Sequence, residues 1–391
     1  MEKATRQHTK SHNTSLVLKT IYDHTSISRA DIARETRLTR PTVSRIVSDF
    51  IEGGLVIENG LGPSAGGKRP TLLNIAHDNT QLLCLDLGDR EFRGAVVNLR
   101  GEILARVYFP TNGHRGPEAL DLVYQVADTL IEASNVRILG IGVGTPGLTN
   151  PMKGIIGNAV NLGWSNLPLR NLLQDRYGLP IYVANDSHMA ALGEYTFGRH
   201  RESKNLIVIK IGRGVGAGIV INGQPYYGDG YGAGEIGHVT VDSDRQQCRC
   251  GNFGCLEASV STRALMKKAG EIAQECPESS LAGNDQIDWD LIVRSVAARD
   301  PASNDMITKA GKSLGYILAS LVGTLNIQNV VISGRVSQFG DVLIRAIERE
   351  ARLRVLPSMA EDTHLSFSLL GKDIVILGCS AMIMRHELGI I

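Results

Sequence analysis

The chain has 391 residues, 43% of them hydrophobic, and is long enough for two or three domains with sizeable buried cores. No apolar run approaches the roughly eighteen residues of a membrane-spanning helix. The first thirty residues are polar and charged, unlike a signal peptide. We therefore expect a cytoplasmic protein with no membrane partner.

The formal net charge of +1 is unevenly distributed. Residues 1–45 hold nine Lys or Arg against four Asp or Glu, a net charge of +5, which leaves −4 for the remainder. A basic head on a mildly acidic body is typical of a protein that meets a polyanion through one domain. A solvated charged face would have the same composition, so charge alone does not decide.

Three helices are predicted in the basic head. Apolar residues at helical spacing predict the first around residues 13–24, and Ser28 is placed to cap a second over residues 29–36. After a short turn, Thr39 is placed to cap a third helix. The apolar residues of this third helix recur at i, i+3, i+4 and i+7 and must face a core: Val43, Ile46, Val47 and Phe50.

The opposite face of the third helix is polar near its start, where a recognition helix presents side chains to the major groove. Arginine can bond guanine edges or phosphates, and Ser and Thr can contact either. We predict that the DNA-contacting residues of this helix are Arg40, Thr42, Ser44 and Arg45. A three-helix bundle without a role in DNA binding would also have a polar face.

Two strands are predicted after this helix, at residues 55–57 and 71–75. The segment between them is rich in Gly and Pro and carries Lys68 and Arg69, so we predict a wing whose basic tip contacts DNA. A loose linker between domains is the alternative interpretation. With the wing, residues 1–76 form a winged helix-turn-helix.

Beyond this head, short apolar runs alternate with glycine-rich turns and helical stretches, which is typical of α/β proteins. The runs are residues 82–87, 94–99, 138–143, 206–211, 216–221, 330–333 and 374–378. Residues 85–88 precede one predicted hairpin, and the similar residues 210–214 precede another. We therefore expect a duplicated, two-lobed domain over residues 80–391.

One imidazole and three thiols lie within eighteen residues, and glycines at 251 and 254 allow the loop to curl. The four ligands are His238, Cys248, Cys250 and Cys255. Such a set suits tetrahedral zinc and leaves no open position for water, so we predict about one structural zinc ion per chain. Three cysteines packed as small apolar side chains are the alternative.

Three segments of the body carry a resemblance to a known family. They read Ala-Asn-Asp-Ser-His-Met-Ala-Ala-Leu-Gly-Glu at 184–194, Gly-Tyr-Gly-Ala-Gly-Glu-Ile-Gly-His at 230–238 and Cys-Arg-Cys-Gly-Asn-Phe-Gly-Cys-Leu-Glu at 248–257. These motifs resemble the ROK family of repressors and sugar kinases, and the head resembles that of its winged-helix repressor branch. The resemblance implies an actin-like fold of sugar-kinase type, with two RNase H-like lobes and a sugar in the cleft between them.

The resemblance also implies the sugar-binding residues. The matching positions are Asn185, Asp186, Glu235, His238 and Glu257, with Asn161 as a further candidate that a turn would equally explain. Carboxylates and amides form hydrogen bonds in fixed directions, so such a site rejects analogues that lack a hydroxyl. We expect Asn185 and Asp186 on one side of the ligand and the other matching residues opposite. His238 could present one ring nitrogen to zinc and the other to the sugar.

The phosphate-binding turns differ from those of the family's kinases. Those kinases have Asp-x-Gly-Gly-Thr in the first turn, whereas this chain has Asp86-Leu-Gly-Asp-Arg90, with Asp89 where triphosphate would lie. The second turn has Gly-Arg-Gly at 212–214 instead of Gly-Thr-Gly. Asp186 could still supply the base that a kinase needs. Because both turns differ, we predict no kinase activity.

The predicted function is therefore a sugar-responsive repressor of carbohydrate-utilisation genes that binds a double-stranded DNA operator. A two-fold operator would require a homodimer or homotetramer. Two alternatives stay open: an active ROK sugar kinase with a DNA-binding domain, and a zinc-responsive regulator.

Overall fold

The computed structural model describes residues 6–63, 69–201, 203–241, 246–284 and 286–391. The chain divides into two compact units. Unit 1 consists of Met1–Gly147, Pro151–Ala184 and Cys379–Ile391, and unit 2 of Leu148–Asn150 and Asn185–Gly378. Among the residues described, no helix is long and apolar enough to cross a membrane.

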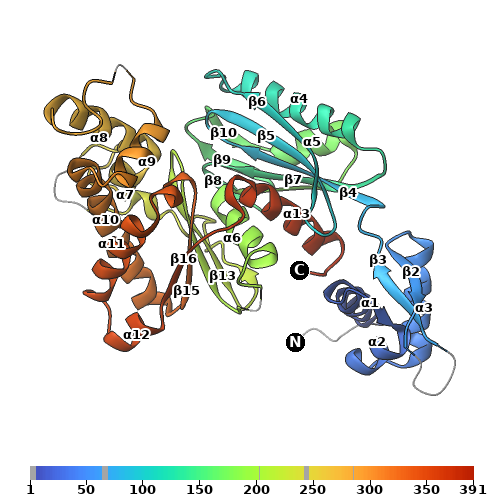
Figure 1. The fold of residues 1–391 in the computed structure, drawn as a ribbon. Helices are drawn as coiled ribbons and strands as arrows, with labels where there is room; N and C mark the ends of the chain where they lie inside the picture. The colour runs from blue at the N-terminus through green and yellow to red at the C-terminus, as the bar shows by residue number, and fades with distance from the viewer. Residues whose placement is uncertain (1–5, 64–68, 202, 242–245, 285) are drawn as a thin grey trace. The chain divides into compact units, whose positions relative to one another are not determined.

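Unit 1 begins with a winged helix-turn-helix (Figure 1). Its elements are α1 (Arg6–Asp23), β1 (Ile27–Ser28), α2 (Arg29–Thr36), α3 (Arg40–Glu52), β2 (Val56–Leu61) and β3 (Thr71–Ile75). Both predicted caps are confirmed, since the Ser28 hydroxyl accepts from the Asp31 amide at 3.2 Å and the Thr39 hydroxyl accepts from the Thr42 amide at 3.4 Å. The strands pair in the order β1-β3-β2.

The third helix buries the predicted stripe, because Val43, Ile46, Val47 and Phe50 are at most 7% exposed. Gly53 caps this helix, and the predicted strands are present as β2 and β3. The two-residue strand β1 was not predicted. It takes its extended form from pairing with β3, where Ile27 lies opposite Leu73, and two residues show no periodicity in a sequence.

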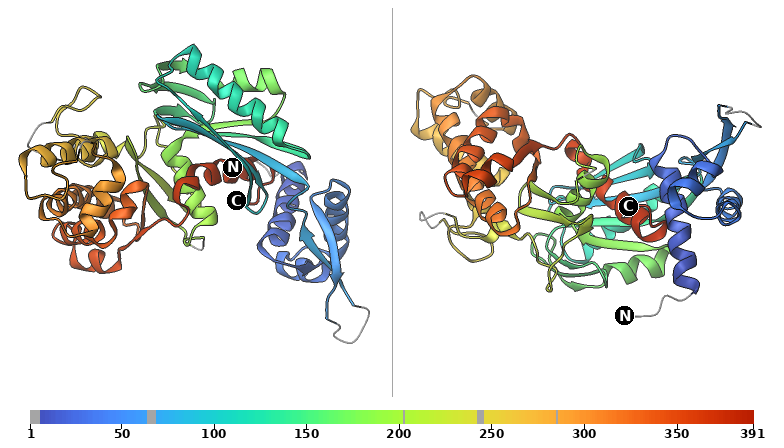
Figure 2. Two further views of the ribbon diagram at one scale, coloured as in Figure 1. Left: turned by 45° about the horizontal axis from the view of Figure 1, so that its top comes forward. Right: turned by 90° about the horizontal axis from the view of Figure 1, so that it is seen from below.

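The rest of unit 1 is built on a five-stranded sheet with the order β11-β7-β4-β5-β6. Its strands are β4 (Thr80–Leu87), β5 (Glu91–Asn98), β6 (Ile103–Pro110), β7 (Arg137–Thr145) and β11 (Ile181–Asn185). The helix α4 (Pro117–Ala133) covers one face of the sheet, and α13 (Ile374–Glu387), which starts in unit 2, covers the other (Figure 1, Figure 2). The hairpin β9 (Ile155–Ala159) and β10 (Trp164–Leu167) and the helix α5 (Leu169–Tyr177) complete it.

Unit 2 contains a second five-stranded sheet with the order β14-β13-β12-β15-β16. Its strands are β12 (Leu206–Ile211), β13 (Val215–Ile221), β14 (Gln224–Pro225), β15 (Asn329–Ser333) and β16 (His364–Phe367), with β8 (Leu148–Asn150) apart from them. Its helices are α6 (Asp186–Phe197), α7 (Leu256–Val260), α8 (Thr262–Glu275), α9 (Trp289–Ala297), α10 (Pro301–Leu325), α11 (Gly340–Arg352) and α12 (Pro357–Asp362). Short 3-10 turns are η1 (Ile236–His238), η2 (Arg335–Phe339) and η3 (Gly371–Asp373).

The two sheets repeat one arrangement. In each, a central strand pairs antiparallel with the strand that follows it and parallel with a later strand, β4 with β5 and β7, and β12 with β13 and β15. Residues 85–88 and 210–214 lead into the two equivalent hairpins. The predicted duplication is therefore confirmed.

Six of the seven apolar runs lie in strands, but the interpretation of residues 374–378 as part of that strand pattern is wrong. They begin the helix α13. Ile374, Val375, Ile376 and Leu377 are all at most 8% exposed. A helix turn buried on all sides has the same continuous apolar sequence as a buried strand, so periodicity cannot separate them.

Candidate functional site

The predicted DNA-contacting face is at the surface of α3. Arg40, Ser44 and Arg45 are exposed, and Thr42 is half-buried beside Thr39, with 2.8 Å between the two hydroxyl oxygens. The face points outward because the apolar stripe on the other side of α3 packs into the head. This arrangement presents two guanidinium groups and a hydroxyl to solvent.

The predicted wing is only partly described. The strand β2 continues to Leu61, so the predicted turn begins later than the sequence indicated. Arg69 is exposed just before β3, whereas Lys68 lies outside the described residues. Arg69 therefore adds a cation at the base of the hairpin.

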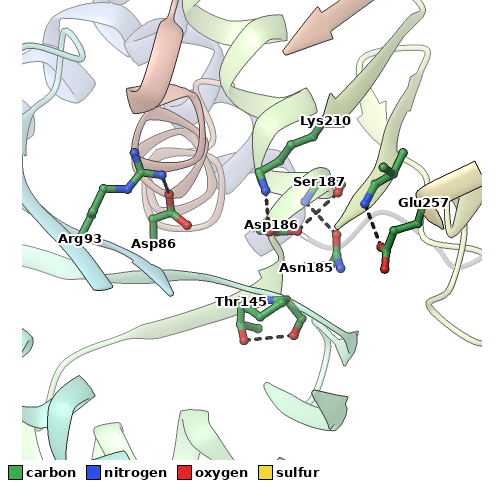
Figure 3. Close-up of polar contacts among 10 residues, drawn as sticks. Asp86, Arg93, Thr145, Asn185, Asp186, Ser187, Lys210 and Glu257 are labelled. Atoms are coloured by element: carbon green, nitrogen blue, oxygen red, sulfur yellow. Dashed lines mark hydrogen bonds and ion pairs between the residues drawn. The ribbon is translucent and has the colours of Figure 1, made fainter. Parts of the chain in front are cut away.

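The polar end of α6 carries two of the predicted sugar-binding residues (Figure 3). The Asn185 side chain caps the helix by accepting from the Ser187 amide at 2.8 Å, and Asn185 is 7% exposed. The ammonium of Lys210 in β12 donates to Oδ2 of Asp186 at 2.7 Å. The Ser187 hydroxyl lies 3.4 Å from Oδ1 of Asp186.

Lys210 was not among the predicted site residues, although the sequence contains a signal for it. The other residues of β12, Leu206–Ile209 and Ile211, are all apolar and at most 1% exposed. A lone lysine in such a strand must find a partner, because an unpaired ammonium is costly to bury.

Glu257 lies in the first turn of α7, and its Oε2 accepts from the Val215 amide at 3.1 Å, at the start of β13 (Figure 3). This bond ties the carboxylate to the turn at 212–214. Glu235 immediately precedes η1. Burial raises the pKa of the Glu235 carboxyl, His238 lowers it, and the carboxylates of Asp186 and Glu257 raise it further. The carboxyl group of Glu235 thus lies within electrostatic range of Asp186 and Glu257.

Asn185, Asp186, Glu235, His238 and Glu257 all belong to unit 2. The expectation that two of them lie on one side of the ligand and three on the other stays a prediction. Their elements converge because α6 packs against β12 and β13, and the loop before η1 bonds back to that sheet. Asn161 belongs to unit 1 and lies in the turn between β9 and β10.

The four predicted metal ligands come together. Their ligand atoms all lie within 4.8 Å of one another. The Cys250 and Cys255 sulfurs are 3.7 Å apart, and the Cys248 sulfur is 3.7 Å from Nδ1 of His238. A tetrahedral ion with Zn–S bonds of about 2.3 Å requires sulfurs about 3.8 Å apart. The donor set and its spacing therefore fit zinc.

Local turns produce this cluster. The Gly251 amide donates to the Cys248 carbonyl at 3.0 Å, and Gly251 has a φ of 94°, which only glycine adopts readily. All six cysteines are free thiols. Burial raises the pKa of the Cys248 thiol and raises that of Cys255 to about 12. Metal binding would displace these protons, since zinc binds the thiolate.

In unit 1, the first phosphate-turn segment contains an ion pair whose carboxylate is buried. Arg93 of β5 lies opposite Asp86 of β4, and its guanidinium donates to Oδ2 of that carboxylate (Figure 3). Asp86 is 2% exposed. The carboxylate that opens the Asp-x-Gly turn is thus held by a protein cation.

Comparison with known proteins extends over both parts of the chain. The ROK family matches residues 82–385 and the MarR family matches residues 11–69. The xylose repressor of Caldicellulosiruptor bescii is 32% identical over 387 residues, covering 97% of each protein. A glucokinase of Halalkalibacterium halodurans is 33% identical over 318 residues, covering 78% of this chain and 94% of its own.

A crystal structure of a ROK family transcriptional regulator, a homologue of the Escherichia coli MLC protein, superposes with a TM-score of 0.87. The two are 29% identical, and the match covers 98% of each chain. These comparisons confirm the predicted fold: a winged helix-turn-helix followed by an actin-like domain of sugar-kinase type.

Proposed function

Because the chain belongs to the ROK family and carries a MarR-type winged helix, we propose that it is a sugar-responsive transcriptional repressor. The observation that carries this proposal is the similarity to a xylose repressor over 97% of both proteins, head and body together. The glucokinase, by contrast, matches 78% of this chain.

DNA binding is assigned to the exposed face of α3. Arg40 and Arg45 read bases or hold phosphates, Thr42 and Ser44 add hydroxyl contacts, and the basic wing contacts the adjacent backbone. One such head covers a short site, so we infer a homodimer or homotetramer on a two-fold operator.

The effector is a sugar held by the polar residues of unit 2, Asn185, Asp186, Glu235, His238 and Glu257, and Asn161 of unit 1 is a further candidate. Nδ1 of His238 lies beside Cys248, which leaves Nε2 for a sugar hydroxyl. Carboxylates and amides that accept or donate in fixed directions are the groups that distinguish sugars by their hydroxyls.

One zinc ion per chain, held by His238 and the three cysteines, would stiffen the loop between η1 and α7. The ion would fix the imidazole and restrain the segment that carries Glu257. A four-ligand set has no open position for a substrate, so the metal is structural. This closed set also argues against a zinc-responsive regulator, which needs a readily exchanged ion.

Phosphoryl transfer is not part of the proposed function. Asp86 in the first phosphate turn is paired with Arg93, and the same turn carries Asp89 where triphosphate would lie. A kinase needs a carboxylate to accept the proton of the attacking hydroxyl and an open cradle for phosphate. The kinase alternative has one support, the glucokinase that is 33% identical.

The test is sugar-dependent operator binding. Operator DNA is selected from a random duplex library by the unmodified protein and titrated with and without D-xylose, D-glucose or N-acetyl-D-glucosamine. One sugar should change operator affinity by about 10- to 100-fold, a coupling of about 1.4 to 2.8 kcal/mol. Asp186→Ala should bind the same DNA and ignore the sugar. Equal affinity under all conditions contradicts the proposal, and sugar-dependent ATP consumption supports the kinase.

A further inference from the structure

Lys210 is the one charged residue in the otherwise apolar strand β12. It lies in a strand whose other members are apolar and at most 1% exposed, and its own side chain is 22% exposed. Its ammonium reaches Asp186, whose side chain is 18% exposed, at 2.7 Å. Pairing with a carboxylate offsets the cost of placing a partly buried cation in such a strand.

The two oxygens of Asp186 are used unequally. Oδ2 accepts the short, charge-assisted bond from Lys210. Oδ1 has the Ser187 hydroxyl at 3.4 Å, a separation at the outer limit for O–H···O bonds. The carboxylate is thus anchored at Oδ2, while Oδ1 has acceptor capacity left for a stronger donor.

We propose that Lys210 is the positioning residue of the effector site, which fixes Asp186 so that Oδ1 accepts a hydroxyl of the sugar. This inference rests on the proposed sugar-binding function, and it adds Lys210 as the positioning residue and Oδ1 of Asp186 as the acceptor atom. Lys210 does not itself need to touch the ligand. Asn185 supports the same geometry from the backbone side, because its cap fixes the first turn of α6.

Charge supports this role. Both Asp186 and Glu257 lie within electrostatic range of Glu235, so three carboxyl groups lie near one another in the effector site. Lys210 supplies a cation within 2.7 Å of one of them. Without it, Asp186 would be free to rotate away from its acidic neighbours, and the acceptor would no longer be pre-organised.

The experiment is a double-mutant cycle on effector binding. D-xylose, D-glucose and N-acetyl-D-glucosamine are titrated calorimetrically into the unmodified protein, and the tightest binder is titrated into Lys210→Met, Asp186→Asn and the double variant. Each single change should weaken binding at least 10-fold. The double variant should be no weaker than the worse single variant within about twofold, because Lys210 acts only through Asp186.

Two further variants make the result specific. Lys210→Arg retains the cation and should recover most of the affinity, and Lys210→Gln replaces Lys210→Met if the latter does not fold. Lys309→Met removes an exposed lysine that is ion-paired with Asp305, and should have no effect. Operator affinity without sugar should be unchanged in all variants, which shows that the head is intact.

Multiplicative losses in the double variant, or full affinity in Lys210→Met, overturn the inference and leave the proposed function standing. If none of the three sugars binds the unmodified protein, the inference and the proposed sugar response both fail. If Lys210 had only a structural role, Lys210→Met would lower the free energy of unfolding, and its effect on sugar affinity would not depend on Asp186.

Discussion

The guanidinium of Arg100 donates a hydrogen bond of 2.6 Å to the carbonyl oxygen of Tyr22, at the end of α1. It also lies 3.4 Å from the His24 carbonyl and 4.7 Å from the centre of the Tyr22 ring. A cation at the carboxyl end of a helix bonds its unpaired carbonyls and favours its dipole. Arg100 therefore ties the winged helix to the sheet of unit 1.

The turn that carries Arg100 is held by Asn98, whose side chain is fully buried. Its Oδ1 accepts from the Arg100 amide at 2.9 Å, and its amide group donates to Asp78 at 2.8 Å and to Glu102 at 2.9 Å. His77, Asp78 and Glu102 are close enough to hold a metal ion, but the Asn98 amide already occupies this group. We interpret it as a hydrogen-bonded joint between head and body.

The first prediction concerns this joint. Arg100→Ala should lower the free energy of unfolding of the head by about 1.5 to 3 kcal/mol, the range for hydrogen bonds to a charged group. It should also reduce the effect of sugar on operator affinity. Amide hydrogen exchange in α1 measures the first effect. Arg137→Ala, at an exposed arginine of the same sheet, is the control, and equal protection in both variants would contradict the role of Arg100.

Most of the head could be predicted from its sequence because its signals are local. The helix starts depend on the adjacent caps Ser28 and Thr39, and the buried face of α3 depends on the spacing of apolar residues within that helix. The features that were missed depend on residues far apart in the chain. Arg100 meets Tyr22 across 78 positions, and Lys210 meets Asp186 across 24, so no short pattern predicts either contact.

The metal cluster is an intermediate case. Its ligands lie within one loop, so residue types and glycine spacing predicted them, and the structure brings them together. The arrangement of the effector site was harder, because all five residues lie in unit 2, a result of how α6 packs on the second sheet. Sequence order alone does not say which residues share a unit.

A second prediction tests the recognition helix. If Arg45 contacts a base, Arg45→Ala should cost about 1 to 3 kcal/mol of operator affinity and relax specificity at one base position. If Arg45 contacts a phosphate, the same change should weaken binding to all DNA sequences equally and lower the salt dependence of binding. Arg40→Ala is tested in the same way. Fluorescence anisotropy at two salt concentrations separates the cases. Arg299→Ala, in unit 2 outside the head, should change nothing, and unchanged binding in both α3 variants would refute the assignment.

A third prediction concerns zinc. Protein purified without added metal should contain about one zinc per chain by elemental analysis, and Cys250→Ser should lose it, because three ligands hold the ion more weakly than four. Loss of metal should weaken sugar binding through the loop that bears Glu257. Cys276→Ser removes a partly buried thiol outside the cluster and should retain both properties. Full sugar affinity in metal-free protein would show that the loop does not need the ion.

A fourth prediction uses a pair of glycines. A Cβ on Gly378 of α13 would lie 1.8 Å from the Met189 carbonyl oxygen of α6, whereas a Cβ on Gly270 of α8 would meet nothing within 4 Å. Gly378→Ala should therefore lower the free energy of unfolding by about 3 kcal/mol, the upper part of the range for overpacking. Gly270→Ala should raise it by about 0.5 to 1 kcal/mol through helix propensity. Urea unfolding of both variants measures the difference, and equal stabilities would mean that α6 and α13 separate easily.

The last prediction concerns acid stability and His188, which is 4% exposed in α6. Its Nε2 lies 2.8 Å from the Ala233 carbonyl, and no residue in the described part of the chain provides a partner for Nδ1. Burial lowers the pKa of the His188 ring, although the Ala233 carbonyl and Asp186 partly oppose the shift. A proton added at Nδ1 would be a buried donor without an acceptor.

The direction in which stability changes with pH depends on which state, folded or unfolded, binds more protons. In the unfolded chain this ring has a pKa of about 6.5, so above that pH the ring is neutral in both states. As the pH falls below about 6.5, the unfolded chain binds a proton at this ring, whereas the folded chain does not. The free energy of unfolding should therefore fall, by at most about 1.4 kcal/mol per pH unit for this one group. Urea unfolding between pH 7.5 and 5.5 measures the slope. The stability of His188→Gln should fall less steeply with decreasing pH than that of the unmodified protein. Release of zinc by acid would affect both proteins alike. Identical slopes of unfolding free energy against pH would therefore show that His188 is protonated equally in the folded and unfolded states.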